Sequence, residues 1–322
     1  MLSLPDEAFT APWPSSRETF IRDRSRTGPL WSRPHRGVAR SVLVDADAGL
    51  TRVLAAAVAL PGVPLGTWAA ALLHGVPDLD GTTWGGELLD VVFCPGRSGA
   101  RAPRPGLRPL RSTLTDADIV AAPGYPDIPI TSALRTAFDV GRMAPTLPAA
   151  VADLDAVLRV TQVPVPDLAQ YAAERRGWKG VQRVRDALPL LDPRAASRPE
   201  SLMRVVWRVD ADLPPPQVNV PVCASDGTLL GKPDLLDVDS GLVAEFDGSY
   251  HRQADQHADD NVREELFEAH GLTVVRAMFR DVRSPFNSGF VARLRTGYRR
   301  AVQATERQDR RSWFVPPSHL KG

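Results

Sequence analysis

The residues best suited to chemistry lie in two short apolar segments, LLGKPDLLDV and GLVAEF, which carry Asp234 and Glu245. A two-residue turn at 239–240 would join the segments into a β-hairpin in which Asp234 lies opposite Glu245. The Cβ atoms of directly opposed residues are about 5 Å apart. Lys232 and Asp247 would form the next opposed pair on the same face, because residues two apart on a strand share a face.

Two opposed carboxylates repel each other, and burying an unpaired carboxylate is costly. A divalent cation removes this conflict, because Mg²⁺ binds one or two carboxylates together with waters and a substrate phosphate. Such an ion activates water and stabilises the charge that develops on a phosphodiester. The hairpin therefore predicts hydrolysis of phosphodiesters that depends on Mg²⁺ or Mn²⁺. The alternative is a hairpin at a sheet edge whose charges are solvated.

The two longer stretches GKPDLLDVDSGLVAEFDGSYH and DDNVREELFEAHGLTVVRAMFRDV carry a resemblance. They resemble the actinobacterial endonuclease-domain proteins of domain of unknown function 559, which are related to very-short-patch repair endonucleases of the PD-(D/E)XK superfamily. The resemblance implies a restriction-endonuclease-like α/β domain at 197–304, with the element order α-β-β-β-α-β-α and a mixed sheet. The matching residues are Asp234, Glu245, Asp247, Gly248, His251, Asp260, Arg263, Leu266, Gly271 and Arg276.

In such domains an acid on the first helix joins the two strand acids around the metal, and Glu200 occupies that position. The resemblance thus implies the metal ligands Asp234, Glu245 and Glu200. The same glutamate also completes an S-x-x-E capping box that begins at Ser197, and a capping box needs no metal. Both interpretations of Glu200 stay open at the level of the sequence.

The superfamily pattern places a lysine two residues after the second acid, where this chain has Asp247. The candidates for moving a proton or stabilising developing charge are Lys232, His251 and Arg263. Lys232 alternatively only neutralises Asp247. With Asp234, Glu245 and Asp247, these three side chains make up the predicted catalytic set.

The front of the chain resembles the region that precedes this nuclease-like domain in actinobacterial proteins, which is related to AbiEi-type antitoxins of type IV toxin–antitoxin systems. The resemblance implies an N-terminal winged helix that binds DNA, and a cognate toxin or dimer partner. Proline and serine interrupt 11–34, so a degenerate winged helix and a working one both stay open for residues 1–48, with LWSRPHRGVARSVLV entering a strand or wing. The matching segments are RGV (36–38), AAALLHGVPD (69–78), TSALRTAFDVGR (131–142) and DLDAVL (153–158).

Periodicity and turn residues predict the elements that position these residues. An Arg/Pro-rich region (1–48) precedes a mainly helical α+β domain (49–192), a linker rich in small residues and proline, the nuclease-like domain (197–304) and a polar tail (305–322). Expected helices of the α+β domain lie within 51–73, split by PGVPLG, and at 147–160, 165–175 and 179–190. The segment 128–143 is expected to be the end of a strand followed by a helix with Thr131 or Ser132 as N-cap. A strand is expected at 88–94. The nuclease-like domain is expected to contain helices 199–211, 255–270 and 288–304 and strands 217–224, 229–238, 241–247 and 272–279.

The composition is that of an ordinary globular protein of 322 residues with a formal net charge of +1. Of its 39 basic residues three are lysines, which leaves 36 arginines. The Arg-rich loop 96–112 and the basic helix 288–304 therefore either bind DNA phosphates or reflect a general preference for arginine. The sequence has no CxxC pair, signal peptide or apolar stretch long enough for a membrane, which predicts a cytoplasmic protein without a membrane partner.

Three functions remain in competition. The first is a Mg²⁺-dependent DNA endonuclease. The second is a catalytically inactive, antitoxin-like transcriptional regulator that uses the nuclease fold to bind DNA. The third is a protein–protein partner in a toxin system.

Overall fold

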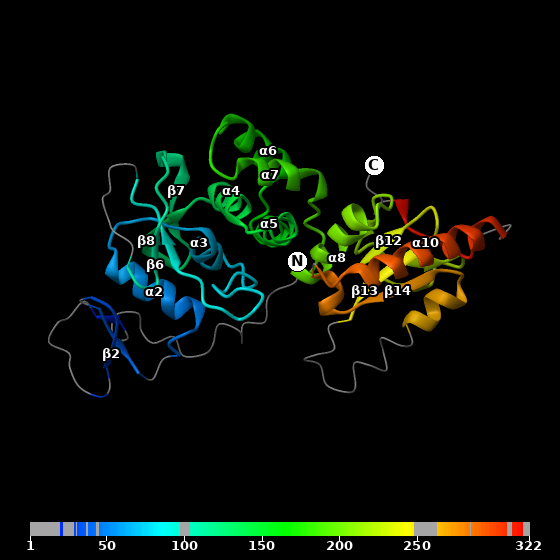
Figure 1. Cartoon of the computed structure of the whole chain (residues 1–322), viewed down its shortest axis with the longest axis horizontal. Coiled ribbons are helices and arrows are strands. Elements are labelled where there is room, and N and C mark those ends of the chain that lie inside the picture. Colours follow the sequence, from blue (N-terminus) through cyan, green and yellow to red (C-terminus); the bar gives the residue numbers. More distant parts are fainter. Residues whose placement is uncertain are drawn as a thin grey trace. The chain divides into compact units, whose positions relative to one another are not determined.

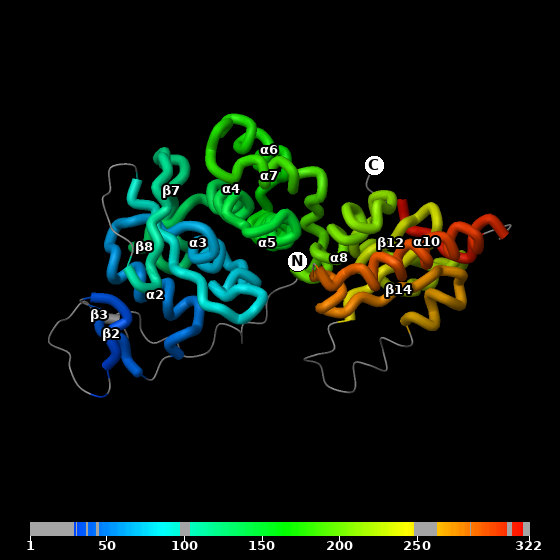
Figure 2. Tube along the Cα trace, viewed as in Figure 1, coloured from blue at the N-terminus to red at the C-terminus, as the bar shows by residue number. Residues whose placement is uncertain are grey.

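The computed structural model describes residues 20–21, 29, 31–36, 38–42, 45–96, 104–247, 263–283, 285–307 and 311–317. The chain forms two compact units, Met1–Val140 (unit 1) and Gly141–Gly322 (unit 2). In Figures 1 and 2 the colours run from blue to green in unit 1 and from green to red in unit 2. None of the helices in the described ranges has the length and apolar character needed to cross a membrane.

Unit 1 begins with a small antiparallel sheet in which β3 (Val38–Ser41) lies between β1 (Phe20–Ile21) and β2 (Trp31–His35). Strands β2 and β3 occupy the segment LWSRPHRGVARSVLV, in which the sequence predicts a strand or wing, whereas β1 precedes it. Helices α2 (Gly49–Ala59) and α3 (Thr67–Leu73) follow, and they are separated at PGVPLG as predicted.

The second sheet of unit 1 has the strand order β6-β5-β4-β8-β7 and mixes parallel with antiparallel pairs. Helix α4 (Ala133–Met143) follows this sheet, and the Oγ of Ser132 accepts a hydrogen bond from the backbone N–H of Arg135 at 3.4 Å. This contact confirms an N-cap at Ser132. The strands are β4 (Leu65–Gly66), β5 (Val91–Phe93), β6 (Leu107–Pro109), β7 (Ile119–Ala122) and β8 (Tyr125–Thr131).

The polar residues of the segment TSALRTAFDVGR are buried in this unit and bonded to one another. Arg135 is fully buried, donates from Nε to Asp139 at 2.7 Å and donates from Nη2 to the Oγ of Ser112 at 2.6 Å. The hydroxyls of Thr131 and Thr136 are 2.6 Å apart. Buried polar groups require such partners, so these residues hold helix α4 against the sheet and the loop before it.

Unit 2 starts with the helices α5 (Leu147–Thr161), α6 (Val165–Glu174) and α7 (Val181–Ala187) and the 3₁₀ turn η3 (Leu188–Leu190), close to the predicted ranges. Helix α8 (Arg198–Val205) then packs along α5 and continues into the π-helical turn η4 (Val206–Asp210). The predicted domain boundary between 192 and 197 therefore falls inside unit 2.

A buried ion-pair network joins α5 to α8. Asp155 of α5 is fully buried and accepts hydrogen bonds from Arg204 and from the Oγ of Ser201, the latter at 2.6 Å. Its other oxygen accepts from the backbone N–H of Asp192 at 2.8 Å. Arg204 also donates to the carbonyl oxygens of Leu190 and Asp192. Helix α5 of the helical segment and helix α8, which follows that segment, thus share a buried polar network.

The rest of unit 2 has mixed α/β structure with two sheets, of strand order β14-β13-β12-β9 and β11-β10-β15. Strands β13 and β14 are parallel, whereas β12 is antiparallel to both of its neighbours. Residues 263–269 and α10 (Ser288–Arg307) are helical, as predicted for those positions. The strands are β9 (Gln217–Val218), β10 (Val222–Ala224), β11 (Leu229–Gly231), β12 (Leu235–Asp237), β13 (Leu242–Phe246), β14 (Thr273–Ala277) and β15 (Trp313–Phe314).

Two predicted strands are wrong as continuous elements. The strand predicted at 229–238 divides around Pro233 into β11 and β12, which belong to different sheets. Proline has no N–H for a sheet ladder and is disfavoured inside a central strand. The strand predicted at 217–224 divides around Asn219, whose φ is +50° and ends β9.

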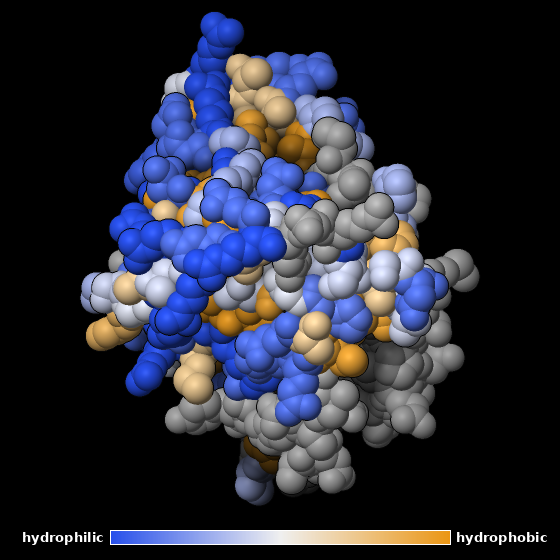
Figure 3. Space-filling model, turned by 90° about the vertical axis from the view of Figure 1, so that its right-hand side faces the viewer, coloured by the Kyte–Doolittle hydropathy of each residue, from blue (hydrophilic) through white to orange (hydrophobic). Residues whose placement is uncertain are grey.

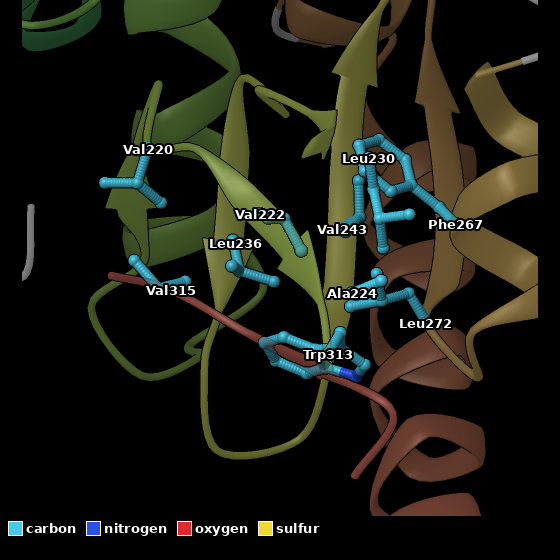
Figure 4. Packing of buried hydrophobic residues seen from close by; sticks show 10 residues of the cluster. All are labelled: Val220, Val222, Ala224, Leu230, Leu236, Val243, Phe267, Leu272, Trp313 and Val315. Carbon is cyan, nitrogen blue, oxygen red and sulfur yellow. The ribbon is translucent and has the colours of Figure 1, made fainter. Parts of the chain in front are cut away.

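The two sheets enclose a hydrophobic core (Figure 4), to which Trp313 of β15 and Phe267 of the helical segment 263–269 contribute the aromatic rings. Leu236 of β12 and Val243 of β13 are opposed in the ladder, and both point into this core. Because residues two apart share a face, Asp234 and Glu245 lie on the same face, at the end of the core.

Candidate active site

Asp234 immediately precedes β12, and Glu245 lies in the partner strand β13. The paired residues of the two strands are Leu235 with Ala244, Leu236 with Val243 and Asp237 with Leu242. This is the register that the sequence predicts, and its extension by one residue sets Asp234 opposite Glu245. The connecting turn is longer than the predicted two residues. It contains the four residues 238–241, and the backbone N–H of Gly241 donates to Asp237. The register is the predicted one because the turns 239–240 and 238–241 share the same centre, between Asp239 and Ser240.

The carboxylate of Asp234 is held at the end of the ladder. Its Oδ2 accepts a hydrogen bond from the backbone N–H of Phe246 at 2.7 Å. Burial raises the pKa of Asp234 from 3.8 to about 7, with further contributions from the negative charges of Glu200 and Glu245. The hydrogen bond from Phe246 and the charge of Arg263 act in the opposite direction. Asp234 is therefore the member of an acidic cluster that resists ionisation.

Glu245 is buried, with 5% of its surface exposed, and forms an ion pair with Arg263. Its Oε2 lies 3.0 Å from Nη2 of Arg263. Arg263 is one helical turn before Phe267, so the helix that packs Phe267 into the core also directs Arg263 to the carboxylates. Gly231 allows this approach, because a Cβ there would lie 2.9 Å from the Phe267 ring and 3.1 Å from Cδ of Arg263.

Glu200 lies near Asp234, since its charge raises the pKa of that carboxyl, but both of its oxygens serve the helix start. Oε1 accepts from the Oγ of Ser197 at 2.8 Å, and Oε2 accepts from the backbone N–H of Ala196 at 2.7 Å. Oε2 also accepts from Nδ2 of Asn219 at 2.9 Å. These hydrogen bonds favour the capping interpretation of Glu200 over that of a metal ligand.

Of the remaining predicted site residues the structure describes Lys232 and Asp247. Lys232 is exposed and lies between β11 and β12, so the β12–β13 ladder does not pair it with Asp247 as expected. The backbone N–H of Asp247 donates to the carbonyl oxygen of Ala277 at 2.8 Å, which continues the contact between β13 and β14 by one residue. His251 lies outside the described residues, as do Gly248 and Asp260.

The donor set fits a cation held by two carboxylates. Within the described ranges no group of three or more His, Cys, Asp or Glu side chains is placed to hold a metal ion. Two carboxylates are nevertheless a donor set of the kind that Mg²⁺ accepts, because the ion completes its coordination with waters and a phosphate. The raised pKa of Asp234 is the expected property of a carboxylate whose charge lacks a counterion.

A substitution separates the electrostatic role of Glu200 from its capping role. In Glu200→Gln the capping box can re-form, because Gln also serves at this position. The pKa of Asp234 is expected to fall, because the second-largest cause of its elevation is removed. Carboxyl-carbon NMR titration of Asp234 measures the change, with Glu264→Gln as the matched control. An unchanged pKa in Glu200→Gln would contradict the proximity of the two carboxyls.

Asn219 is a site residue that the sequence did not reveal. Its Nδ2 donates both to Glu200 and to the carbonyl oxygen of Arg194, the latter at 2.9 Å. Its positive φ turns the chain out of β9, a conformation that Asn tolerates better than most residues. The only signal in the sequence is an asparagine that interrupts the apolar segment QVNVPV.

The basic helix α10 is partly committed to structural contacts. Arg293 pairs with Asp281 at 2.7 Å, and Arg295 donates to the carbonyl oxygens of Ala211 and Asp210. Arg299 and Arg300 are exposed. The side of unit 2 seen in Figure 3 is covered mainly by hydrophilic side chains. Of the Arg-rich loop, residues 97–103 lie outside the described ranges.

The comparisons with known proteins give relatives that are uncharacterized. No family model matches the chain, and no solved structure matches it. Two uncharacterized proteins of Mycobacterium tuberculosis, from strains CDC 1551 / Oshkosh and ATCC 25618 / H37Rv, are each 32% identical over 154 residues. The match covers 48% of this chain and 56% of each relative, so the chain spans about half the length of the curated relatives it matches.

Proposed function

We propose that this chain is a DNA endonuclease that depends on a divalent metal, with a restriction-endonuclease-like core in unit 2. The observation that carries the proposal is the placement of Asp234 and Glu245 at one end of the β12–β13 ladder, where the register extended by one residue sets the two acids opposite each other. Glu245 is buried and Asp234 is half-buried, and burial with neighbouring negative charge raises the pKa of Asp234 to about 7. A structural role alone gives no reason for two acids to be opposed where both are largely shielded from water.

Asp234 and Glu245 would hold Mg²⁺ or Mn²⁺. When bound, the ion supplies activation of water and stabilisation of charge on the phosphate. Arg263 already lies 3.0 Å from Glu245 and would bind a phosphate oxygen or compensate charge that develops during hydrolysis. Asp247, Lys232 and His251 are proposed as further catalytic residues. Exposed arginines of α10, such as Arg299 and Arg300, would contact the DNA backbone.

Plasmid nicking tests this function. The wild type is expected to nick supercoiled DNA with Mg²⁺ or Mn²⁺, and the double variant Asp234→Asn/Glu245→Gln is expected to lose at least about 10³-fold in rate, because metal catalysis contributes several kcal/mol. The control Asp239→Asn/Glu306→Gln removes the same charge at exposed positions and should nick normally. DNA retention without cleavage by the wild type in either metal contradicts the proposal.

One contact favours a second function, that of an inactive DNA-binding regulator. The guanidinium of Arg263 neutralises Glu245 without any metal, and this chain lacks the lysine of the superfamily pattern. A regulator would bind its own promoter through residues 1–48, so removal of these residues should abolish binding in a gel-shift assay. Unchanged promoter binding after the deletion, together with metal-dependent nicking, would exclude this alternative.

A further inference from the structure

Unit 2 contains a cavity of about 290 Å³ that is separate from the carboxylate pair. It lies among the segment that follows η3, the end of α8 with η4, and the start of β9. Three of its lining residues are arginines, Arg194, Arg204 and Arg208, and one is an acid, Asp192. A cavity with this lining favours an anionic ligand.

The charges around the cavity are not balanced. Arg194 is bound by Asp192 at two points, Nε to Oδ1 at 3.0 Å and Nη2 to Oδ2 at 2.9 Å. Arg204 is paired with the buried Asp155. Arg208 instead donates from Nη1 to a neutral acceptor, the carbonyl oxygen of Leu213, at 3.2 Å. Positive charge therefore remains at Arg208, the arginine best able to bind a phosphate.

The other walls are apolar and stiff. Pro189, Pro215 and Pro216 line the cavity together with Leu190, and proline has little backbone freedom to lose when a ligand binds. A volume of about 290 Å³ is near the lower end of the range for small-molecule sites, roughly 300–1,000 Å³. The cavity thus has room for an anionic group on a small planar or apolar body.

We propose that this cavity binds the phosphate of a nucleotide, with the phosphate on Arg208 and the nucleoside against the prolines. The cavity is connected to the surroundings of Asp234: Gln217 lines it, and Asn219, which follows β9, donates to the carbonyl oxygen of Arg194 and to Glu200, whose charge acts on Asp234. The shared chemistry is a phosphate on a nucleoside, either free or at the end of a strand. The inference does not require that the chain cleave DNA.

Calorimetric titration of the full chain in EDTA tests the proposal with thymidine 5′-monophosphate, thymidine and inorganic phosphate as probes. The monophosphate is expected to bind more tightly than thymidine. Arg208→Gln should weaken its binding about 10- to 100-fold, the effect of losing a hydrogen bond to a charged group. Arg176→Gln, at an exposed arginine outside the cavity, should leave binding unchanged.

A second variant keeps the test decisive if Arg208→Gln lowers stability. Gln217→Glu places a negative charge in the lining and should weaken the monophosphate but not thymidine. Equal affinity for the monophosphate and thymidine, or equal effects of Arg208→Gln and Arg176→Gln, would overturn the proposal.

A tetranucleotide with and without a 5′-phosphate distinguishes a free nucleotide from the end of a strand as the source of the phosphate. Tighter binding of the phosphorylated tetranucleotide identifies a strand end. Retained binding in Asp234→Asn/Glu245→Gln separates this cavity from the proposed metal pair.

Discussion

Asp234→Asn is expected to make the protein more stable than the wild type at pH 8 but not at pH 4. The folded-state pKa of Asp234 is raised from 3.8 to about 7, so the folded protein binds more protons than the unfolded chain between these pH values. The stability associated with this group is complete below pH 3.8 and is lost as pH rises to about 7. The loss is at most about 4 kcal/mol, since one pKa unit corresponds to about 1.4 kcal/mol.

Urea unfolding from pH 4 to pH 8 in EDTA measures this effect. The advantage of Asp234→Asn over the wild type should grow with pH, whereas the exposed Asp239→Asn should show no such trend. Saturating Mg²⁺ should stabilise the wild type at pH 8 and leave Asp234→Asn unchanged, because an ion that binds only the folded state stabilises it. Parallel stability profiles for wild type and Asp234→Asn would contradict the raised pKa.

The second large effect is expected from Arg204→Met, which should lower the free energy of unfolding by about 3–5 kcal/mol. The variant leaves the carboxylate of Asp155 buried without its guanidinium partner, while burial already raises the pKa of Asp155. Arg300→Met, on the exposed side of α10, is the matched control and should cost little. Urea unfolding at pH 7 provides the measurement.

The helices that are destabilised in Arg204→Met also test how α5 and α8 are coupled. Because this pair joins α5 to α8, hydrogen exchange should accelerate in both helices of the variant. Acceleration in α8 alone would mean that the helical segment 147–187 is stable without its neighbour. A decrease of less than about 1 kcal/mol in the free energy of unfolding would mean that the Arg204–Asp155 pair contributes no more than a solvated surface ion pair.

The hairpin register could be predicted from the sequence because it depends on local features. Alternating side chains and the position of the turn are sufficient to predict the β12–β13 register, even though the predicted turn is two residues shorter than the observed one. The position of Lys232 could not be predicted in this way. It depends on where the chain leaves one sheet for the other, and Pro233 sets that point.

Contacts between distant segments were beyond prediction from one sequence. Nothing local to Asp155 indicates a partner at Arg204, and the proline- and alanine-rich segment between them was interpreted as a linker. The two interpretations of Glu200, as a helix cap and as a neighbour of the acidic pair, show the same dependence on contacts between distant segments. The capping box is visible in the sequence, but the nearness of Glu200 to Asp234 follows from the packing of the chain.

Turn 238–241 has a consequence for how this chain can change over generations. The paired residues of β12 and β13 lie outside the turn, so a turn that absorbs an inserted or deleted residue leaves these side chains facing each other as they are. A slip of one strand by one residue would instead move all of its side chains to the other face of the sheet. Homologues that keep both acids should therefore vary in the length of this turn more readily than in the length of the two strands.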